Sequence, residues 1–195
     1  PDGLNPEPTQ TLYAGATNQR FGQALALADF NQDGQPDLAV GAPYTSGISV
    51  QNGAVYLFLG VADGFFESEP TQILFGKHGY DRFGFALTSC DYNKDGKQDL
   101  IVSANYDEDR STPNRTDSQG GVHIFFGTET GLEIEPRHII WGKSWTEGAW
   151  ENTANLQLGF SLASGDFNGD GDCDIAVGAY TWSHDRSGKD GTVFL

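Results

Sequence analysis

Three acidic stretches of the sequence have the residue types and the spacing of cation-binding loops. They read DFNQDGQPD at 29–37, DYNKDGKQD at 91–99 and DFNGDGDCD at 166–174. Each has Asp at position 1, Asn at 3, Asp at 5, Gly at 6 and Asp at 9. In such a loop the oxygens of positions 1, 3 and 5 face one side, where the carbonyl of position 7 and the carboxylate of position 9 complete a cage.

Calcium is the ion that this set of oxygens fits. Ca²⁺ takes about six to eight oxygen ligands, carbonyls included, in a flexible geometry, whereas Mg²⁺ demands a strict octahedron and keeps its waters. The glycine at position 6 supplies the backbone freedom for the turn. We therefore predict three calcium sites, in which Gln35, Lys97 and Asp172 contribute backbone carbonyls: Asp29, Asn31, Asp33, Gln35 and Asp37; Asp91, Asn93, Asp95, Lys97 and Asp99; Asp166, Asn168, Asp170, Asp172 and Asp174.

Two simpler interpretations of these loops account for less of the pattern. An EF-hand would place Glu at position 12, but position 12 counted from Asp29 is Val40, and the flanking segments have strand patterns. A single Asp-Gly pair is typical of a hairpin turn. The same five residue types recurring three times favour a metal-binding role.

The charge of the chain agrees with cations as partners. The 195 residues carry a formal net charge of −16, which argues against nucleic acid and anionic lipid surfaces as direct partners, and no apolar run is long enough for a membrane helix. Carboxylates a few ångströms apart repel by about 1–4 kcal/mol per pair. We therefore expect metal binding to be linked to stability.

The acidic loops bring the rest of the sequence into register as a repeat. Each repeat has four segments of five to eight residues that are mostly apolar, β-branched or aromatic and are bounded by Gly, Asp or Asn, which are strand signals. The segments are 21–28, 83–90 and 158–165 before the loops, 37–42, 99–104 and 174–179 after them, then 53–60, 121–127 and 191–195, and, before each FG or LG, 11–15, 72–76 and 138–142.

Four short strands per repeat favour the blades of an all-β propeller. The first strand of each repeat alternates small residues, as expected where innermost strands converge. A β-sandwich with glycine-rich turns is the alternative fold, although it does not require this phased recurrence. The small residues are Ala24, Ala26 and Ala28, then Ala86, Thr88 and Cys90, then Ser161, Ala163 and Gly165.

The segments amount to three blades' worth of strands, whereas closed propellers have about four to eight blades. We expect a partial propeller over 1–195, with the last strand of a preceding blade and a linker at 1–20, blades at 21–82 and 83–157, and three strands of a blade at 158–195. Either a longer polypeptide supplies the remaining blades, which we favour, or copies associate, for example as a six-blade ring of two chains.

The motifs of the repeat follow one order: FG, then D-x-N-x-D-G-x-x-D, then GAP or GA, and then a glycine-led strand such as GAVYLF. This order resembles the FG-GAP repeat of integrin α-subunit head domains. The same repeat occurs in glycosylphosphatidylinositol-specific phospholipase D and in microbial surface proteins. The resemblance covers essentially the whole chain. It departs at Leu158, which replaces Phe, at 103–105, which read SAN instead of GAP, and at Tyr180, which replaces Pro.

The resemblance implies that the calcium loops lie on the bottom rim and that partner-binding loops lie on the top. The extra residues of the second repeat fall in 105–120 and 142–157, both on the expected top face, and insertions gathered on one face often mark a binding side. Aromatic residues there are candidate contacts for a protein or glycan, although single loop aromatics more often pack onto their own scaffold. They are Tyr44, Tyr80, Tyr106, Trp145, Trp150, Tyr180 and Trp182.

Three functions remain open at this stage. The leading hypothesis is a non-catalytic, calcium-stabilised module for extracellular adhesion or recognition. The alternatives are an accessory propeller region of a larger secreted hydrolase and a structural spacer of a surface assembly. The four histidines show no metal or triad spacing, and His123 lies in a strand, where packing is the expected role: His78, His123, His138 and His184.

Two further features bear on the compartment. Cys90 and Cys173 could pair or could remain two buried thiols, and spacing does not decide between these. Asn114 begins the sequon Asn-Arg-Thr, which would accept a glycan in a secreted eukaryotic protein.

Overall fold

The described part of the protein consists of β-strands and connecting loops. The structure, a computed structural model, describes residues 9–15, 17–62, 64–110, 118–146, 149–152, 156–181 and 191–195, with only the backbone considered at 143–146 and 149–152. None of these residues forms a helix, and so none forms one long and apolar enough to cross a membrane.

Three antiparallel sheets carry the repeat, and consecutive strands pair with each other in every sheet. We call them blades 1, 2 and 3. Blade 1 contains β1 (Ala24–Ala28), β2 (Asp37–Ala42), β3 (Ala54–Phe58) and β4 (Gln72–Phe75); blade 2 contains β5 (Phe83–Cys90), β6 (Asp99–Ala104), β7 (Gly121–Phe125) and β10 (His138–Trp141); blade 3 contains β13 (Leu158–Gly165), β14 (Asp174–Ala179) and β15 (Thr192–Phe194).

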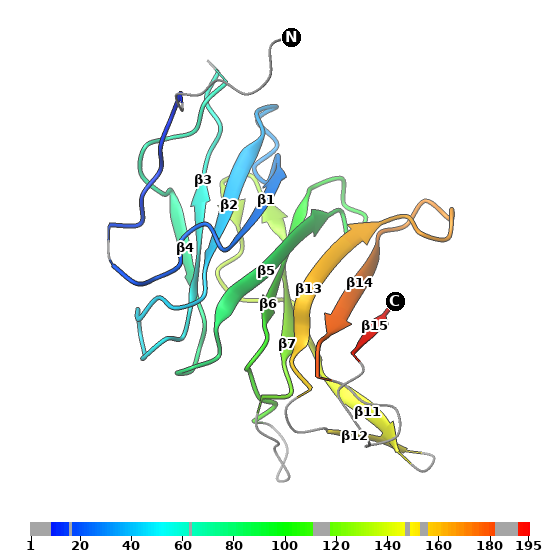
Figure 1. Ribbon diagram of the computed structural model, residues 1–195. Coiled ribbons are helices and arrows are strands. Elements are labelled where there is room, and N and C mark those ends of the chain that lie inside the picture. Colours follow the sequence, from blue (N-terminus) through cyan, green and yellow to red (C-terminus); the bar gives the residue numbers. More distant parts are fainter. Residues whose placement is uncertain are drawn as a thin grey trace, which may run out of the picture.

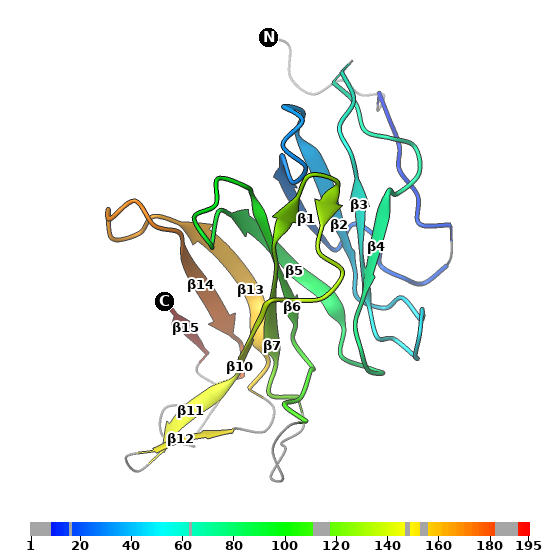
Figure 2. The ribbon, with the colours of Figure 1, turned by 180° about the vertical axis from the view of Figure 1, so that it is seen from behind.

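The blades stand side by side, with β5 between β1 and β13 (Figure 1). The outermost strands β4 and β10 are seen most clearly from behind (Figure 2). This is the arrangement of propeller blades, so the predicted all-β fold class is confirmed. The three described sheets do not close into a ring.

The hydrophobic core has two clusters between the blades, which we call seams, and a third cluster on the outer face of blade 1. Seam 1–2 joins buried residues of blade 1, such as Val55 and Leu57, to Leu87 and Val102 of blade 2. Seam 2–3 is formed by Ile101, Val122, Ile124, Leu156, Leu158, Val177 and Ala179.

The middle strands of blade 2 are mostly apolar because both of their faces are covered. In β6, Leu100 and Val102 pack in seam 1–2, whereas Ile101 between them packs in seam 2–3. Every residue of β6 and of β7 is buried. Burying a Val, Leu or Ile side chain contributes about 1.5–3 kcal/mol, so each middle strand stabilises two seams at once.

The alternating small residues lie where neighbouring first strands approach each other. Ala26 is buried in seam 1–2, and Ala24 and Ala28 pack against the same cluster. The residues between them on β1, Leu25 and Leu27, point to the other face and are 60% and 58% exposed. The small side chains of β1 therefore face blade 2 and allow β1 and β5 to pack closely.

Glycines permit backbone contact across both seams. Gly53, with φ +82°, forms a parallel bridge with Phe83, and a Cβ atom there would lie 2.2 Å from the Phe83 carbonyl oxygen. Gly120, with φ +83°, would place a Cβ 2.3 Å from the carbonyl oxygen of Leu158. Leu158, which replaces the Phe of FG, therefore occupies the same position in its seam as Phe83 does.

The strand pattern predicted from the sequence differs from the structure in two places. Residues 11–15 form no strand; Leu12 and Ala14 pack instead against the outer face of blade 1, where no other described strand lies beside them. Two short hairpins also went unpredicted. They are β8 (Gly127–Thr128) with β9 (Gly131–Leu132), and β11 (Lys143–Thr146) with β12 (Ala149–Asn152).

The FG glycines provide a test of seam packing. Gly84 has φ +84°, and a Cβ would meet the Ala54 carbonyl oxygen at 2.5 Å, whereas Gly22 has φ +87° with nothing within 4 Å. Gly22→Ala should cost about 1–2 kcal/mol of unfolding free energy from the left-handed backbone alone. Gly84→Ala should cost about 1–3 kcal/mol more because of overpacking. Urea unfolding measures both, and equal losses would contradict the seam contact.

Candidate metal centre

The three acidic loops lie at one edge of the molecule, which we call the acidic face. Each loop connects the first strand of its blade to the second, and all three are at the upper edge in Figure 1. The opposite edge, which we call the loop face, carries the connection between β2 and β3, the described residues of the connection between β6 and β7, and the β11–β12 hairpin. The sequence-based division into two rims agrees with this arrangement.

Inside the second loop, backbone N–H groups hold the acidic side chains in place. The carboxylate of Asp91 accepts hydrogen bonds from the N–H groups of Asp95 (3.1 Å) and Gly96 (2.9 Å). The amide oxygen of Asn93 accepts from Asp95 N–H (2.8 Å), and the amide nitrogen donates to the Asp95 carboxylate (3.0 Å). Asp95 in turn accepts from Lys97 N–H (2.8 Å).

The other two loops repeat these contacts position by position. In each, positions 1 and 3 accept from the N–H of position 5, position 1 accepts from the N–H of position 6, and position 5 accepts from the N–H of position 7. The side chains concerned are Asp29, Asn31 and Asp33 in the first loop and Asp166, Asn168 and Asp170 in the third. One scaffold is thus built three times.

Position 9 anchors the loop to the rest of its blade. The buried carboxylate of Asp37 accepts from Phe30 N–H (2.8 Å) and from Gly60 N–H (2.9 Å), which follows β3. Asp99 likewise accepts from Gly127 N–H (2.9 Å), beyond the end of β7. These carboxylates therefore connect the acidic loop to the third strand.

In the first and second loops, the position 9 carboxylates are more costly to ionise than a free aspartate. Burial raises the pKa of Asp37, and the charges of Asp33 and Asp29 raise it further, although backbone N–H groups oppose the shift. Burial likewise raises the pKa of Asp99. By contrast, the Lys97 N–H holds the pKa of Asp95 below its usual value. A cation in the loop would relieve the repulsion at position 9.

The donor set fits a calcium ion: two carboxylates and an amide oxygen on one turn, a third carboxylate at the base, and a backbone carbonyl at position 7. Among the described residues, His78, Asp81 and Asp107 form a group whose ligand atoms all lie within 4.8 Å of one another. The three carboxylates of an acidic loop do not meet this limit, so at least two of them are farther apart. Oxygens on opposite sides of a calcium ion are about 4.6–5.2 Å apart, which is compatible with that spacing. The ligand assignment remains a prediction.

In the first and second loops, the side chain at position 4 reaches toward the next loop. Gln32 and Lys94 both have left-handed backbones, with φ 59° and 62°. The Gln32 side-chain amide donates to the Gly96 carbonyl (2.8 Å), and Lys94 Nζ lies 2.6 Å from Asp172 Oδ1. Neighbouring acidic loops are therefore in direct contact.

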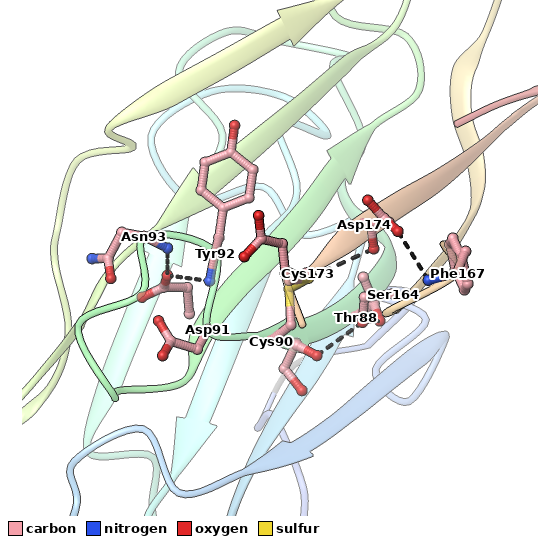
Figure 3. The surroundings of a disulfide bond; sticks show 12 residues. Thr88, Cys90, Asp91, Tyr92, Asn93, Ser164, Phe167, Cys173 and Asp174 are labelled. Carbon is pink, nitrogen blue, oxygen red and sulfur yellow. Dashed lines mark hydrogen bonds between the residues drawn. A yellow bond between two sulfur atoms is a disulfide. The ribbon is translucent and has the colours of Figure 1, made fainter. Parts of the chain in front are cut away.

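A disulfide links the second and third loops, which settles the pairing that the sequence left open. Cys90 and Cys173 are bonded, with their Cα atoms 6.2 Å apart and 83 positions between them in sequence. Figure 3 shows the bond between the end of β5 and the third loop. Closing a loop of this length removes about 4–5 kcal/mol of unfolded-state entropy in the chain-entropy model.

On the loop face, two of the predicted contact aromatics hold the seams together. The guanidinium carbon of Arg82 lies 3.8 Å from the ring centroid of Tyr106 and 5.1 Å from that of Tyr44. The guanidinium carbon of Arg20 also lies over the Tyr44 ring, 4.3 Å from its centroid, and the side-chain amide of Gln157 donates to the Tyr106 hydroxyl (3.1 Å). Tyr44 and Tyr106 thus pack onto their own scaffold.

The remaining aromatics fall into three groups. Tyr80 is 60% exposed, and Tyr180 is 59% exposed although it stacks on Phe160 at 4.8 Å. Trp145 and Trp150 are register partners in the β11–β12 hairpin. Trp182 and the sequon Asn114 lie outside the described residues.

An ionic cluster around the buried carboxylates of Asp81 and Asp107 escaped sequence reasoning. Arg110 bridges Asp81 Oδ1 (3.4 Å) and Asp107 Oδ1 (3.3 Å). His78 Nδ1 lies 3.4 Å from Asp81 Oδ2, and His123 Nε2 lies 3.0 Å from Asp107 Oδ2. The only sequence signal was the charged run 106–110, which does not reveal its partners.

This cluster ties the connection before β5 to the connection after β6. His78, Asp81 and Asp107 are the trio with ligand atoms within 4.8 Å, and Arg110 already provides them with a positive charge. Burial, together with the charge of Asp107, raises the pKa of Asp81 to about 7. His123 packs edge-on against Phe83, in agreement with its expected packing role.

Known proteins with the same repeat can now be compared. The FG-GAP repeat model matches residues 21–58, 83–125 and 158–195. Phosphatidylinositol-glycan-specific phospholipase D of Mus musculus is 46% identical over 108 residues, which are 55% of this chain and 12% of that protein. Integrin alpha-3 of Mus musculus is 37% identical over 138 residues, 69% of this chain and 12% of that protein. Integrin alpha-PS2 of Drosophila melanogaster is 37% identical over 177 residues, 83% of this chain and 11% of that protein.

The fold and the repeated loops define an FG-GAP β-propeller module. The chain belongs to the FG-GAP repeat family, which confirms the resemblance drawn from the motifs. It spans about an eighth of the length of the relatives quoted above.

Asp81 gives a prediction for pH. Because its pKa rises from 3.8 to about 7 on folding, its contribution to stability is complete below about pH 4 and is lost as the pH rises through 7. The wild type should therefore lose stability relative to Asp81→Asn over this range, by at most about 1.4 kcal/mol per pH unit. Urea unfolding at several pH values in millimolar calcium measures the difference, with Glu129→Gln as the exposed control. A difference independent of pH would contradict the assignment.

Proposed function

We propose that the chain is a non-catalytic, calcium-stabilised propeller module of an extracellular recognition protein. The observation that carries the proposal is the hydrogen-bonded scaffold of the acidic loops, which recurs three times on one face. Identical scaffolds with identical oxygen donors support one ion per loop, three in all.

The chemistry of the proposed sites is charge compensation. Positions 1, 3, 5 and 9 would supply side-chain oxygens to Ca²⁺, and Gln35, Lys97 and Asp172 would supply carbonyls. The ion would neutralise carboxylates that otherwise repel each other, and its binding free energy would add to the stability of the strands on either side.

The loop face is the proposed recognition surface for a protein or glycan partner. Tyr80 and Tyr180 are exposed there, whereas Tyr44 and Tyr106 serve the scaffold beneath. Trp145 sits in a hairpin that projects from this face (Figure 1). Trp150 and Trp182 complete the set of candidate contacts.

Further blades are proposed as partners of blade 1. Leu25 is 60% exposed, whereas Leu87, its counterpart one repeat later, is 8% exposed because blade 1 covers it. A groove of about 430 Å³ beside Leu25, lined by Leu12, Phe21 and Phe66 among others, supports a blade packing there. That blade could come from the same polypeptide or from another chain.

Extracellular localisation is part of the proposal. The Cys90–Cys173 disulfide supports it, because such bonds persist in oxidising compartments. Asn114 is the proposed glycan acceptor.

A second candidate function is an accessory propeller region of a larger secreted hydrolase. It is favoured by the 46% identity to phosphatidylinositol-glycan-specific phospholipase D of Mus musculus. The two candidates differ in the domains that they expect beside the module, so any sequence that flanks residues 1–195 separates them. A structural spacer is the third possibility, and it predicts that the loop face binds nothing.

Calcium titration tests the metal sites. Isothermal titration calorimetry of the wild type should give three calcium ions per chain, and Asp33→Asn should give two, because position 5 loses a carboxylate ligand. Each ion present at about 100 times its Kd should add about 2.7 kcal/mol to the free energy of unfolding. A chelator should correspondingly lower the melting temperature.

The matched control is Asp172→Asn, which removes a charge from an acidic loop but not a proposed side-chain ligand. It should still bind three ions. A stoichiometry that is independent of Asp33, or a melt unchanged after calcium is removed, would contradict the proposed sites.

The loop face is tested by replacing Trp145 and Trp150 with Ala together. Binding to a glycan array or to a captured partner in calcium should fall at least about tenfold if these side chains are interface anchors. Phe167→Ala, which removes an aromatic residue that is 51% exposed on the acidic face, is the control. Binding indifferent to the tryptophan pair would remove them as candidates.

A further inference from the structure

The Cys90–Cys173 disulfide lies directly beside the ligands of two acidic loops. Cys90 immediately precedes Asp91, position 1 of the second loop, and Cys173 stands between Asp172 and Asp174, positions 7 and 9 of the third loop. Figure 3 shows both neighbourhoods around the one bond. A single covalent link thus joins the backbones that carry ligands for two different ions.

The surroundings hold both ends of this link. The hydroxyls of Thr88 and Ser164 are hydrogen-bonded at 2.7 Å, and the Ser164 hydroxyl also donates to the Ser89 carbonyl (2.9 Å), so β5 and β13 are joined just before the disulfide. Reaching over from the second loop, Lys94 contacts Asp172 at 2.6 Å. Blade 3 and its acidic loop are therefore joined to blade 2 by contacts beside the disulfide as well as by the disulfide itself.

The chain contains its own reference for this arrangement. Ala28 occupies the position equivalent to Cys90 in blade 1, and Gln98 occupies the position equivalent to Cys173 in the second loop. Across that junction, the Gln32 side-chain amide donates a hydrogen bond to the Gly96 carbonyl. The first loop thus has the same ligand pattern as the third but no sulfur.

We propose that the Cys90–Cys173 disulfide positions the third loop for calcium and makes that site sensitive to redox conditions. The inference rests on the proposed calcium sites. Position 8 separates two ligands, so fixing it limits the relative movement of the Asp172 carbonyl and the Asp174 carboxylate, and a preorganised site binds more tightly.

The redox step is an ordinary thiol–disulfide exchange with a dithiol as the reductant. A dithiol thiolate attacks one sulfur, the Cys–Cys bond breaks, and a mixed disulfide forms. The second thiol of the reductant then displaces the cysteine. Two electrons and two protons pass to the protein, giving two thiols, and the reductant leaves as a cyclic disulfide.

Thermodynamic linkage makes the effect reciprocal. If reduction weakens calcium binding at the third loop by some factor, then calcium must shift the dithiol–disulfide equilibrium toward the disulfide by the same factor. Calcium should therefore protect this bond from reduction.

The test compares calcium binding by the wild type and by Cys90→Ser/Cys173→Ser, using calorimetry with Ca²⁺ alone. One of three sites should weaken at least about fivefold, and the other two should change by less than about twofold. Loop-specific variants identify the site. Asp170→Asn lacks the third site, so removing the disulfide in that variant should leave the affinities of its two remaining sites unchanged. Asp33→Asn keeps the third site, so removing the disulfide in that variant should still weaken one site.

The redox equilibrium of the wild type provides a measurement that needs no cysteine variant. Equilibration with a dithiol buffer, with and without calcium, should show at least about a fivefold shift toward the disulfide. The shift should vanish in Asp170→Asn and remain in Asp33→Asn. This arm applies even if the double serine variant fails to fold.

The outcomes separate the two proposals. No calcium binding by the oxidised wild type would overturn the proposed function. Three sites that do not respond to the disulfide would overturn only the inference, as would equal weakening of all three, which would indicate a global effect. A redox equilibrium that is independent of calcium in a protein that binds three ions would overturn it as well.

Discussion

The constraint on which the structure depends is that each sheet must bury two faces at once. A sheet with one covered face could stand alone with a polar exterior, but β6 carries apolar residues on both sides and needs blade 1 and blade 3 together. The first strands approach closely because alanines face the seam, and glycines let backbone meet backbone at Gly53 and Gly120. Stability is therefore a property of neighbouring pairs of blades, as in other repeat proteins.

The acidic face follows from the same arrangement. The loops join the first and second strands, so the packing of three blades through two seams brings three negatively charged turns to one rim. The position 9 carboxylates extend this link inward, because Asp37 and Asp99 also hold the backbone beyond the third strand. The charged loops at the rim are thereby linked to the positions of the strands in blades 1 and 2. The Cys90–Cys173 bond links blade 2 to blade 3.

Sequence reasoning succeeded where the information is local and repeated. The loop at 29–37 and its two copies fix the register of the strands, and the register predicts the blades. It failed where a residue finds a partner far along the chain: the pattern around Arg82 does not reveal that it lies between Tyr44 and Tyr106, nor does the run 106–110 reveal Asp81. Residues 11–15 have a strand-like composition, but a strand needs a neighbour to pair with. Sequence periodicity reports on one segment at a time, whereas these contacts form between segments that are far apart in the sequence.

The unequal exposure of the two outer blades has a consequence for assembly. Blade 1 presents Leu25 beside a groove lined by Leu12 and Phe21, whereas blade 3 presents Phe160 and Val193 beside a pocket of its own, so the two open surfaces are unlike. Surfaces of this kind match head to tail and not like to like. Any association of such chains through these surfaces would have a direction, and its rotation from one copy to the next would decide between a closed ring and an open spiral.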